Sequence, residues 1–432
     1  MSAETTTSST VPGASAAAAK EPLGRTFHTH LAGVGLANVA DGIMAAAVPL
    51  IALTLTRSPL LVSLISVAFF LPWLLLGILA GVVVDRTDRR RAQLAGMAVR
   101  VTLLVALTTL VVSDRLTMPL LIAIAFGYGI TDVVVDLAGS SIVPSIAPRS
   151  RLSAANGRVL AVQQVCATFI GAPIAAGLLV LGAGWAAGVP AALGVAFLLL
   201  IGLAMRGSYK VERTGSTTGW AEVTEGARFL VRHPVLRPLL VSGSLLNMAN
   251  TGYFAVFVLW VVGAGSEVGL SAEHYPLLVM LLAVGAVAGS LLAEPLVRRW
   301  AEMPLMFTCW AVNSVGLLVP LLWPHPAPIA ATFLLLGVTN TIGNVIGQTV
   351  RQRLVPGELL GRVGGAARTI GYGLMPLGAL LGGQVAETWG LATVFGGATV
   401  ICLLAVAYVA SRVTQDMVTV YDTEASGSVD PA

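Results

Sequence analysis

About twelve apolar stretches, each about twenty residues long, constrain the fold of this chain more than any other feature. A stretch of this length can cross the hydrocarbon core of a bilayer as a helix. Only 11% of the 432 residues are charged, whereas soluble domains carry roughly a quarter charged residues. The sequence therefore predicts an all-α membrane protein. The expected spans cover residues 29–53, 60–84, 92–112, 118–139, 155–181, 184–205, 237–262, 275–297, 303–323, 327–348, 362–385 and 390–411.

Positive charges alternate from one loop to the next. Arg57 and Arg115 are the basic residues of the odd-numbered loops, and Arg100 lies inside the third span. All other lysines and arginines fall in the tails, in the even-numbered loops or at the helix ends that border them. Cytoplasmic loops carry the excess of lysine and arginine. We therefore expect a multi-pass protein of the cell membrane with both termini in the cytoplasm, in agreement with an even number of spans.

Polar segments divide the chain into separate parts. Residues 1–27 are rich in Ser, Thr and Ala, and we expect a disordered cytoplasmic tail there. Residues 28–206 and 236–411 form two groups of six spans. The linker between them, residues 207–235, ends in a segment with amphipathic helical spacing, which is expected to lie along the membrane surface. Residues 412–432 are acidic, and we expect a second disordered cytoplasmic tail.

A charged motif at the end of the second span recurs after the eighth. The first copy reads Gly81-x3-Asp85-Arg86-x2-Arg89-Arg90, and the corresponding residues of the second are Glu294, Arg298 and Arg299. Gly171 and Pro173 in the fifth span are echoed by Pro376 and Gly378 in the eleventh. Such duplication predicts two bundles related by a parallel repeat. The glycine and proline pairs are expected to bend these two helices.

The first copy of the motif resembles the signature loop of major facilitator superfamily transporters. Further stretches resemble the branch of enterobactin- and macrolide-efflux-like exporters, also called transmembrane secretion effectors. These stretches are Asn38-Val-Ala-Asp41-Gly42, Ala47-Val-Pro49, Pro144, Leu152-Ser-Ala-Ala-Asn156-Gly157, Glu225-Gly-x-Arg228, His233-Pro-Val-Leu-Arg237 and Gln352-Arg-Leu-Val-Pro356-Gly-Glu358-Leu-Leu-Gly361-Arg362. The resemblance covers about residues 25–412. It implies the major facilitator fold, with twelve transmembrane helices in two six-helix bundles, and transport by alternating access.

The chain departs from the usual exporter pattern at several positions. Asp88 stands where many drug antiporters of this superfamily have glycine, and Ala172 interrupts the fifth-span motif between Gly171 and Pro173. The start of the fourth span also lacks the arginine that proton-coupled drug antiporters commonly carry there. The resemblance therefore favours export but puts proton coupling by the usual residue in doubt.

The resemblance also assigns an inner gate to the motif. It implies that Asp85 and Arg89 brace the inner helix ends, with Gly81 and Arg86 in the same motif and Asp136 within reach of Arg89. The alternative is that these charges only set the orientation in the membrane. Asp85 favours the gate, because an acid opposes the positive-inside pattern.

Asp41 is the sharpest candidate for a role in transport. It lies about 18 Å from the start of the first span, near the midplane of the bilayer. Asn38 lies one helical turn earlier on the same face. A carboxylate in a low-dielectric cavity can alternate between a charged and a neutral form, as a proton-coupling or cation-recognising site requires. The alternative is a carboxylate that only holds a neighbouring helix by hydrogen bonds.

Other polar residues inside the spans have weaker patterns. Arg100 and Asp132 lie at similar depth in antiparallel spans, so we expect an intramembrane ion pair with a structural role. Polar side chains that could line a cavity, or could equally join helices by hydrogen bonds, are Gln163, Gln164, Asn247, Asn250, Asn340 and Asn344.

The sequence favours a secondary active exporter of an amphiphilic small molecule, driven by proton antiport. A drug or antibiotic is the first choice of substrate and a siderophore or another metabolite the second. The alternatives are an uptake symporter on the same fold and a transport-inactive membrane sensor or assembly partner. The sequence has no phosphate-binding loop, no metal-ligand cluster and no other enzyme motif, so we expect no enzyme activity, cofactor or metal. The expected partners are the substrate, protons and membrane lipid, with no nucleic acid, and the chain is expected to be a monomer.

Overall fold

The computed structural model describes residues 22–148, 151–209, 219–356 and 359–427. Within these ranges, the side chains of residues 78–86, 153, 219–224, 360–361 and 424–427 lie outside the description. The first group of helices comprises α2 (Arg25–Leu55), α3 (Pro59–Arg86), α4 (Arg89–Val112), α5 (Met118–Ile146), α6 (Leu152–Gln164), the π-helical η2 (Val165–Gly171), α7 (Ala172–Leu181) and α8 (Ala183–Ala204).

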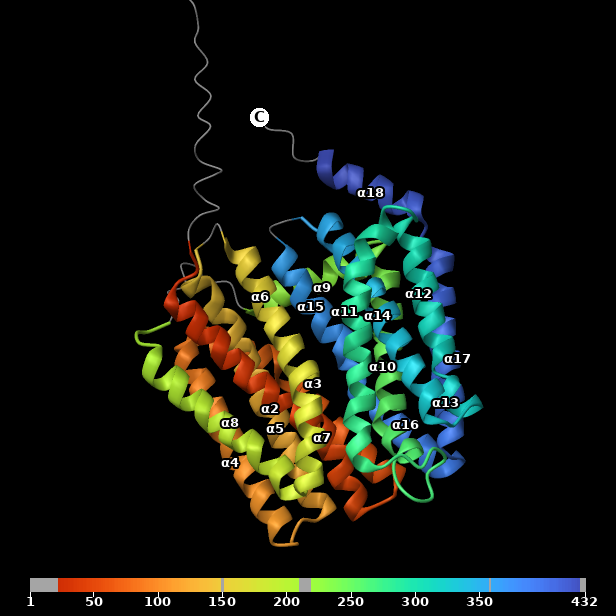
Figure 1. Cartoon of the computed structure of the whole chain (residues 1–432). Helices are drawn as coiled ribbons and strands as arrows, with labels where there is room; N and C mark the ends of the chain where they lie inside the picture. The colour runs from red at the N-terminus through yellow and green to blue at the C-terminus, as the bar shows by residue number, and fades with distance from the viewer. Residues whose placement is uncertain (1–21, 149–150, 210–218, 357–358, 428–432) are drawn as a thin grey trace, which may run out of the picture.

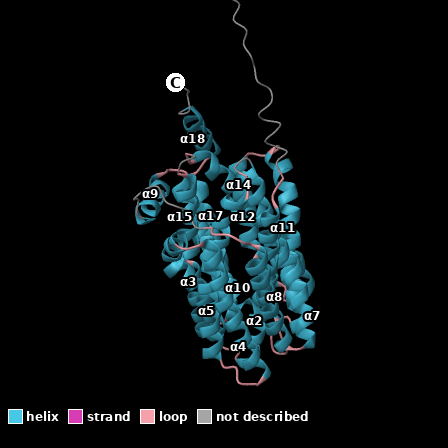
Figure 2. Cartoon of the chain, turned by 90° about the vertical axis from the view of Figure 1, so that its left-hand side faces the viewer, coloured by secondary structure: helices cyan, strands magenta, loops and turns pink. Residues whose placement is uncertain are grey.

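The second group follows the linker helix α9 (Gly219–Arg232). It comprises α10 (Leu236–Val261), the short η3 (Ala272–His274), α11 (Tyr275–Val297), α12 (Glu302–Gly316), α13 (Val319–Leu322), α14 (Pro326–Leu354), α15 (Leu360–Gly373), α16 (Met375–Trp389) and α17 (Leu391–Arg412). A last helix, α18 (Gln415–Gly427), ends the described chain. The two groups stand side by side, and the start of α2 and helix α18 lie at the same end of the molecule (Figures 1 and 2). We call this end the termini face and the other end the opposite face.

Eleven helices, or runs of consecutive helices, in the described part of the chain are long and apolar enough to cross a membrane. Where the sequence predicts an eleventh span, the chain instead forms the two shorter helices α15 and α16, which meet at Leu374. Pro376 stands just after this break, and in the first group Pro173 stands just after the π-helical turn of η2. Proline removes a backbone donor, so both irregularities lie where the helical hydrogen-bond ladder is interrupted. The count of twelve spans stays a prediction.

Each group holds its helices together through a close contact between glycines. A Cβ atom on Gly42 of α2 would lie 1.8 Å from the backbone oxygen of Ala167, and one on Gly171 would lie 2.8 Å from Cα of Gly42. In the second group, a Cβ on Gly378 of α16 would lie 2.0 Å from the backbone oxygen of Met248 in α10. Small residues permit such approaches between membrane helices. The same device therefore joins equivalent helices in both groups.

Among the described residues, clusters of buried apolar side chains connect the two groups at one face only. The largest cluster of buried side chains contains Leu50 and Val62 of the first group together with Val258 and Phe395 of the second. At the termini face, separate clusters belong to the first group, around Phe27 and around Met97 with Phe197, and to the second group, around Met306 with Val350. The two groups are therefore joined by their apolar cores at the opposite face, and each keeps its own core at the termini face.

Both predicted disordered tails are partly helical. Helix α2 begins at Arg25, inside the expected N-terminal tail, whereas residues 1–21 lie outside the described residues. The expected C-terminal tail forms α18, so the prediction of disorder is wrong there. Val418 of α18 is buried in the core of the second group, and the ring of Tyr421 lies 5.3 Å from that of His233. Apolar side chains on one face of this short segment thus hold it against the second group.

Asp88, which departs from the family pattern, is the N-cap of α4. Its carboxylate accepts hydrogen bonds from the backbone N–H of Arg91 at 3.0 Å, the hydroxyl of Ser208 at 2.8 Å and the backbone N–H of Tyr209 at 2.9 Å. Partial burial raises the pKa of this carboxyl, but the hydrogen bonds lower it more, so the pKa lies below its usual value. Asp88 therefore ties the start of α4 to the segment after α8, which glycine could not do.

Candidate functional site

A buried guanidinium organises four helices of the first group. The side chain of Arg100 in α4 is only 2% exposed. Its Nη1 donates to Asp41 Oδ1 of α2 at 2.8 Å, and its Nη2 donates to Asp132 Oδ1 of α5 at 3.0 Å. Its Nε also donates to the hydroxyl of Thr131 at 3.2 Å. One arginine thus holds two carboxylates, as the planar fork of its donors permits.

Neutral donors complete the partners of both carboxylates. The hydroxyl of Tyr128 donates to Asp41 Oδ1 at 2.5 Å, and its ring centre lies 4.5 Å from Cζ of Arg100. The indole Nε1 of Trp73 in α3 donates to Asp132 Oδ2 at 3.0 Å. The five side chains Asp41, Trp73, Arg100, Tyr128 and Asp132 form one unit, which we call the arginine cluster.

The arginine cluster carries a net charge of minus one when both of its carboxylates are ionised, since one cation faces two anions. The carboxylates keep an accessible edge, because Asp41 is 28% exposed and Asp132 is 22% exposed. The two carboxylates and their helices shield Arg100 from solvent. A proton that reaches either carboxylate removes the excess charge, and the guanidinium keeps the other carboxylate as its partner. The arrangement can therefore bind and release one proton without leaving Arg100 unpaired.

The structure brings Arg100 and Asp132 together, the pair that sequence depth predicted, and it adds Asp41 to them. Asn38 does not join this unit, because its Nδ2 donates to the backbone oxygen of Val34 in its own helix at 2.9 Å. The sequence singles out Tyr128 and Trp73 only as aromatic side chains that could contact a lipophilic substrate, and it does not predict that they donate to the two carboxylates. Tyr128 stands one helical turn before Asp132 and could have been found from that spacing. Trp73 lies on a different helix and has no such signal.

Asp136 has partners other than the predicted one. The sequence predicts that Arg89 reaches this carboxylate, but Arg89 Nη1 donates to the backbone oxygen of Ser141 at 2.6 Å. Asp136 instead accepts from Nε2 of Gln163 at 3.4 Å and lies 3.9 Å from Nη1 of Arg368 in α15. Asp136 therefore forms an ion pair between the two groups of helices. The side chains of the other gate candidates, Gly81, Asp85 and Arg86, lie outside the described residues.

The remaining polar candidates divide into two kinds. Asn247 Nδ2 donates to the backbone oxygen of Gly371 in α15 at 3.2 Å and so joins two helices, whereas Asn250 Nδ2 donates to that of Leu246 in its own helix at 2.8 Å. Gln164 donates to the hydroxyl of Thr168 at 3.0 Å. By contrast, Asn340 and Asn344 are exposed and hydrogen-bond to each other at 2.7 Å.

The hydrogen bonds between the two groups, among the described residues, all lie at the opposite face. Glu387 Oε2 of α16 accepts from the hydroxyl of Ser58 at 2.8 Å and from the backbone N–H of Leu60 at 3.2 Å, at the start of α3. Arg57 Nη1 donates to the backbone oxygen of Val262, just after α10, at 2.9 Å. The negative charge of Glu387 thus lies at the N-terminus of α3 and the positive charge of Arg57 at the C-terminus of α10, the arrangement that helix dipoles favour. We call these contacts the opposite-face latch.

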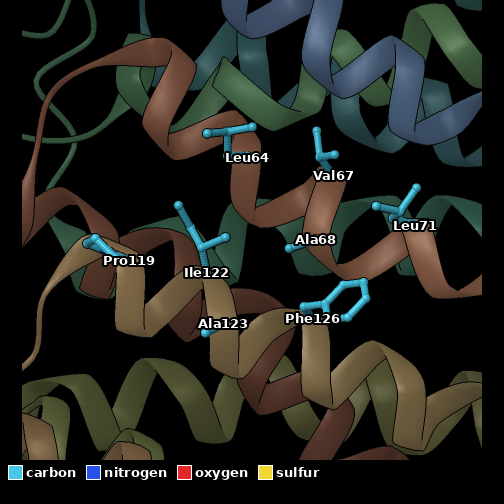
Figure 3. Close-up of a pocket in the computed structure, with 8 residues that line it drawn as sticks. All are labelled: Leu64, Val67, Ala68, Leu71, Pro119, Ile122, Ala123 and Phe126. Atoms are coloured by element: carbon cyan, nitrogen blue, oxygen red, sulfur yellow. The ribbon is translucent and has the colours of Figure 1, made fainter.

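An apolar groove of about 540 Å³ lies between α3 and α5 (Figure 3). Its lining consists of side chains such as Leu64, Val67 and Leu71 of α3 and Ile122 and Phe126 of α5. Such a surface can accept hydrocarbon but offers no polar group to orient a ligand. The groove therefore lacks the polar contacts of a selective site, which the arginine cluster has.

The helix arrangement matches solved transporters of the major facilitator superfamily. The nucleoside transporter NupG aligns with 92% of this chain and 99% of its own chain, at a TM-score of 0.66 and 11% identity. A bacterial homologue of the iron transporter ferroportin in an inward-facing state aligns with 90% of this chain and 99% of its own, at a TM-score of 0.71 and 15% identity. At these identities the likeness shows the fold alone, and it is the major facilitator fold.

Sequence comparison identifies the family within that fold. The model of the transmembrane secretion effector family matches residues 22–430, and the chain belongs to this family of multi-pass membrane transporters. The chain is 26% identical to the multidrug efflux pump Tap of Mycolicibacterium fortuitum, over 83% of this chain and 88% of Tap. It is also 26% identical to an uncharacterised MFS-type transporter, y4rN, of Sinorhizobium fredii, over 86% of this chain and 90% of that protein.

Proposed function

We propose that this chain exports an amphiphilic small molecule by alternating access, in exchange for protons. The similarity to a multidrug efflux pump supports a drug or antibiotic as the first substrate class, with a siderophore or another metabolite as the second. The loop charges support a cell-membrane location with the termini face in the cytoplasm. The joined cores and the opposite-face latch then correspond to a state closed toward the outside.

The observation that carries the proton-coupling proposal is the sharing of Arg100 between Asp41 and Asp132. A cluster with one excess negative charge in a low-dielectric site attracts a proton, and protonation makes the cluster neutral. Movement of one charge through the membrane potential is worth about 2.3 kcal/mol per 100 mV, which is enough to bias the exchange of states. Asp41 is the favoured proton acceptor, because its described hydrogen bonds all go to Oδ1, whereas both oxygens of Asp132 accept hydrogen bonds.

The Asp41→Asn variant is expected to lose proton-driven export, because an amide hydrogen-bonds like a carboxyl but cannot ionise. The measurement is the accumulation of a panel of cationic, neutral and anionic fluorescent amphiphiles in cells, with and without an uncoupler. Wild type should keep accumulation of its substrates at least about tenfold below that of the empty vector, and both the uncoupler and the substitution should abolish the difference. Glu273→Gln is the control, since its 44% exposed side chain lies outside the arginine cluster.

Each other result of this experiment would contradict a specific part of the proposal. Wild-type export that persists with the uncoupler would exclude proton coupling. Normal pumping by Asp41→Asn would make Asp41 structural. Accumulation above that of the empty vector would indicate uptake. No effect on any amphiphile would favour a protein without transport activity.

The Glu387→Gln variant is expected to open the opposite face more often. Loss of the charge weakens the hydrogen bonds to Ser58 and Leu60 and removes the favourable interaction with the positive end of α3. The cysteine of a Ser63→Cys variant, at a position that is 0% exposed beside Gly383 of α16, should therefore react at least about twofold faster with a maleimide reagent in the Glu387→Gln background, judged by gel mobility against the protein without this cysteine. An unchanged rate of labelling would show that Glu387 does not hold the two groups together, and Glu294→Gln, whose side chain is 76% exposed, is the control.

A further inference from the structure

Two arginines of the second group lie close together without sharing a carboxylate. Arg351 of α14 and Arg368 of α15 adjoin Val350 and Ala367, which pack in one buried cluster, and the two guanidinium groups lie within electrostatic range of each other. Arg351 forms no ion pair with the described residues, whereas Arg353 in the same helix turn pairs with Glu302 and Asp422. The charge of Arg351 is therefore not used to hold the described helices together.

The polar stripe of α14 that includes Arg351 faces the interior of the protein. Asn340, Asn344 and Arg351 follow Phe333 by about two, three and five helical turns, so all four lie on one face. Phe333 is buried, and its ring lies 5.2 Å from that of Phe257 in α10. On the other side of α14, Leu335 is an exposed apolar side chain, as expected toward lipid. Exposed asparagines on the inner stripe therefore face space between helices.

Arg368 faces the same region from α15. Its side chain is 56% exposed, and its one carboxylate partner among the described residues is Asp136 of the first group. The separation of 3.9 Å is too long for a hydrogen bond, so several guanidinium donors stay available. Tyr372, one helical turn further along α15, is 46% exposed and adds a hydroxyl. Two guanidinium groups and a phenol thus lie where Asp136 of the first group is a distant counter-charge. The amides of Asn344 and Asn340 continue the polar stripe about 11 and 17 Å farther along α14.

We propose that Arg351 and Arg368 bind an anionic group, a carboxylate or a phosphate, of the amphiphile that this transporter carries. The inference rests on the proposed function, because it names the substrate class of the exporter. The anion removes the repulsion between the two guanidinium groups and takes charge-assisted hydrogen bonds from both. It competes with Asp136 for Arg368, so binding releases an ion pair that joins the two groups of helices at the termini face.

The test is equilibrium binding to the full-length protein in nanodiscs of uncharged phosphatidylcholine. The probes are dansyl-labelled undecanoate and the carboxamide of the same chain, which differ only in charge. Wild type should bind the undecanoate about tenfold more tightly than the amide, as expected for charge-assisted hydrogen bonds. Arg351→Gln and Arg368→Gln should each reduce this preference at least about threefold, and binding of the amide should stay unchanged, which also shows that the variants fold.

Asp136→Asn should act in the opposite direction and increase the preference for the undecanoate, since it removes the competing carboxylate. If the ion pair between Asp136 and Arg368 had only a structural role, Asp136→Asn and Arg368→Gln would both reduce the preference for the undecanoate. Arg412→Gln is the matched control, because it removes an exposed arginine from the end of α17 in the same group. Equal binding of both probes by wild type, or a full preference in the Arg351→Gln/Arg368→Gln double variant, would overturn the proposal.

A second arm distinguishes the substrate from lipid. Phosphatidylglycerol added to the nanodiscs should leave the undecanoate preference intact. If it abolishes the preference, and native mass spectrometry finds this lipid retained by wild type but not by the double variant, the anion is a lipid headgroup and the substrate assignment is overturned. The binding assay needs no proton gradient, so a failure of proton-driven export would leave its result standing, and the two proposals can fail separately.

Discussion

Replacing Arg100 with leucine is expected to abolish transport and to reduce the yield of folded protein several-fold. The substitution leaves Asp41 and Asp132 as two facing carboxylates without their shared cation, in a span where unpaired charge is costly. Removing one partner from a buried ion pair typically costs about 3–5 kcal/mol, and here two pairs are lost together. The measurement is the amount of monodisperse protein after extraction, together with its thermal unfolding in detergent.

A combined variant separates the structural role of Arg100 from its role in transport. The triple substitution Arg100→Leu/Asp41→Asn/Asp132→Asn removes all three charges, so it should restore most of the folded yield and still fail to transport. Arg100→Lys should fold but transport poorly, because one ammonium cannot donate in the fixed fork that reaches both carboxylates and Thr131. If Arg100→Leu unfolds at the wild-type temperature, the two ion pairs contribute nothing to stability, and our account of the arginine cluster is wrong.

The depth of a residue in its span could be predicted from the sequence, but the direction of its side chain could not. Counting residues from the helix ends places Arg100 and Asp132 at similar depth, and the structure brings them together. The same counting places Asp41 deep in the first span, yet gives no information about which helix it faces. Its contact with Arg100 depends on how α2 and α4 are rotated, and that is decided by packing over their whole length.

Contacts between the two groups were the least predictable. The sequence predicts Arg89 of the family motif as the partner of Asp136, whereas the observed partner Arg368 is far away in the chain and in the other group. By the positive-inside rule, Arg351 and Arg368 belong to the positive charges that set the orientation of the chain in the membrane. The rule does not distinguish an arginine that faces lipid headgroups from one that faces the interior of the protein. Only the structure supplies that distinction.

The C-terminal helix shows a different limit. Its acidic composition predicts a solvated tail, but Met417, Val418 and Tyr421 recur at helical spacing and cover one face. This amphipathic helix has 13 residues and is shorter than the apolar stretches of about twenty residues from which membrane helices are predicted. Within the linker, the amphipathic pattern did predict α9, and Glu225 of this helix accepts a hydrogen bond from Arg362 of α15 at 2.5 Å.

The Gly378→Ala variant is expected to destabilise the protein although alanine is the better helix former. In a helix, the change should by itself stabilise by up to about 1 kcal/mol. At this position, however, the new methyl group would lie 2.0 Å from the backbone oxygen of Met248, so α10 and α16 must separate. Overpacking of this kind typically costs about 1–3 kcal/mol. The observed sign therefore decides whether local helix propensity or contact between helices controls this site.

Gly397→Ala in α17 is the matched control, because a Cβ atom there would meet no atom within 4 Å. It should unfold at the wild-type temperature or slightly above, and Gly378→Ala should unfold several degrees below it and transport less. Gly42→Ala should repeat the loss in the first group, where the methyl group would lie 1.8 Å from the backbone oxygen of Ala167. If Gly378→Ala and Gly397→Ala are equally stable, the close helix contact does not hold the second group together. Equal losses of stability at Gly42 and Gly378 would show that the corresponding close helix contact stabilises each of the two groups.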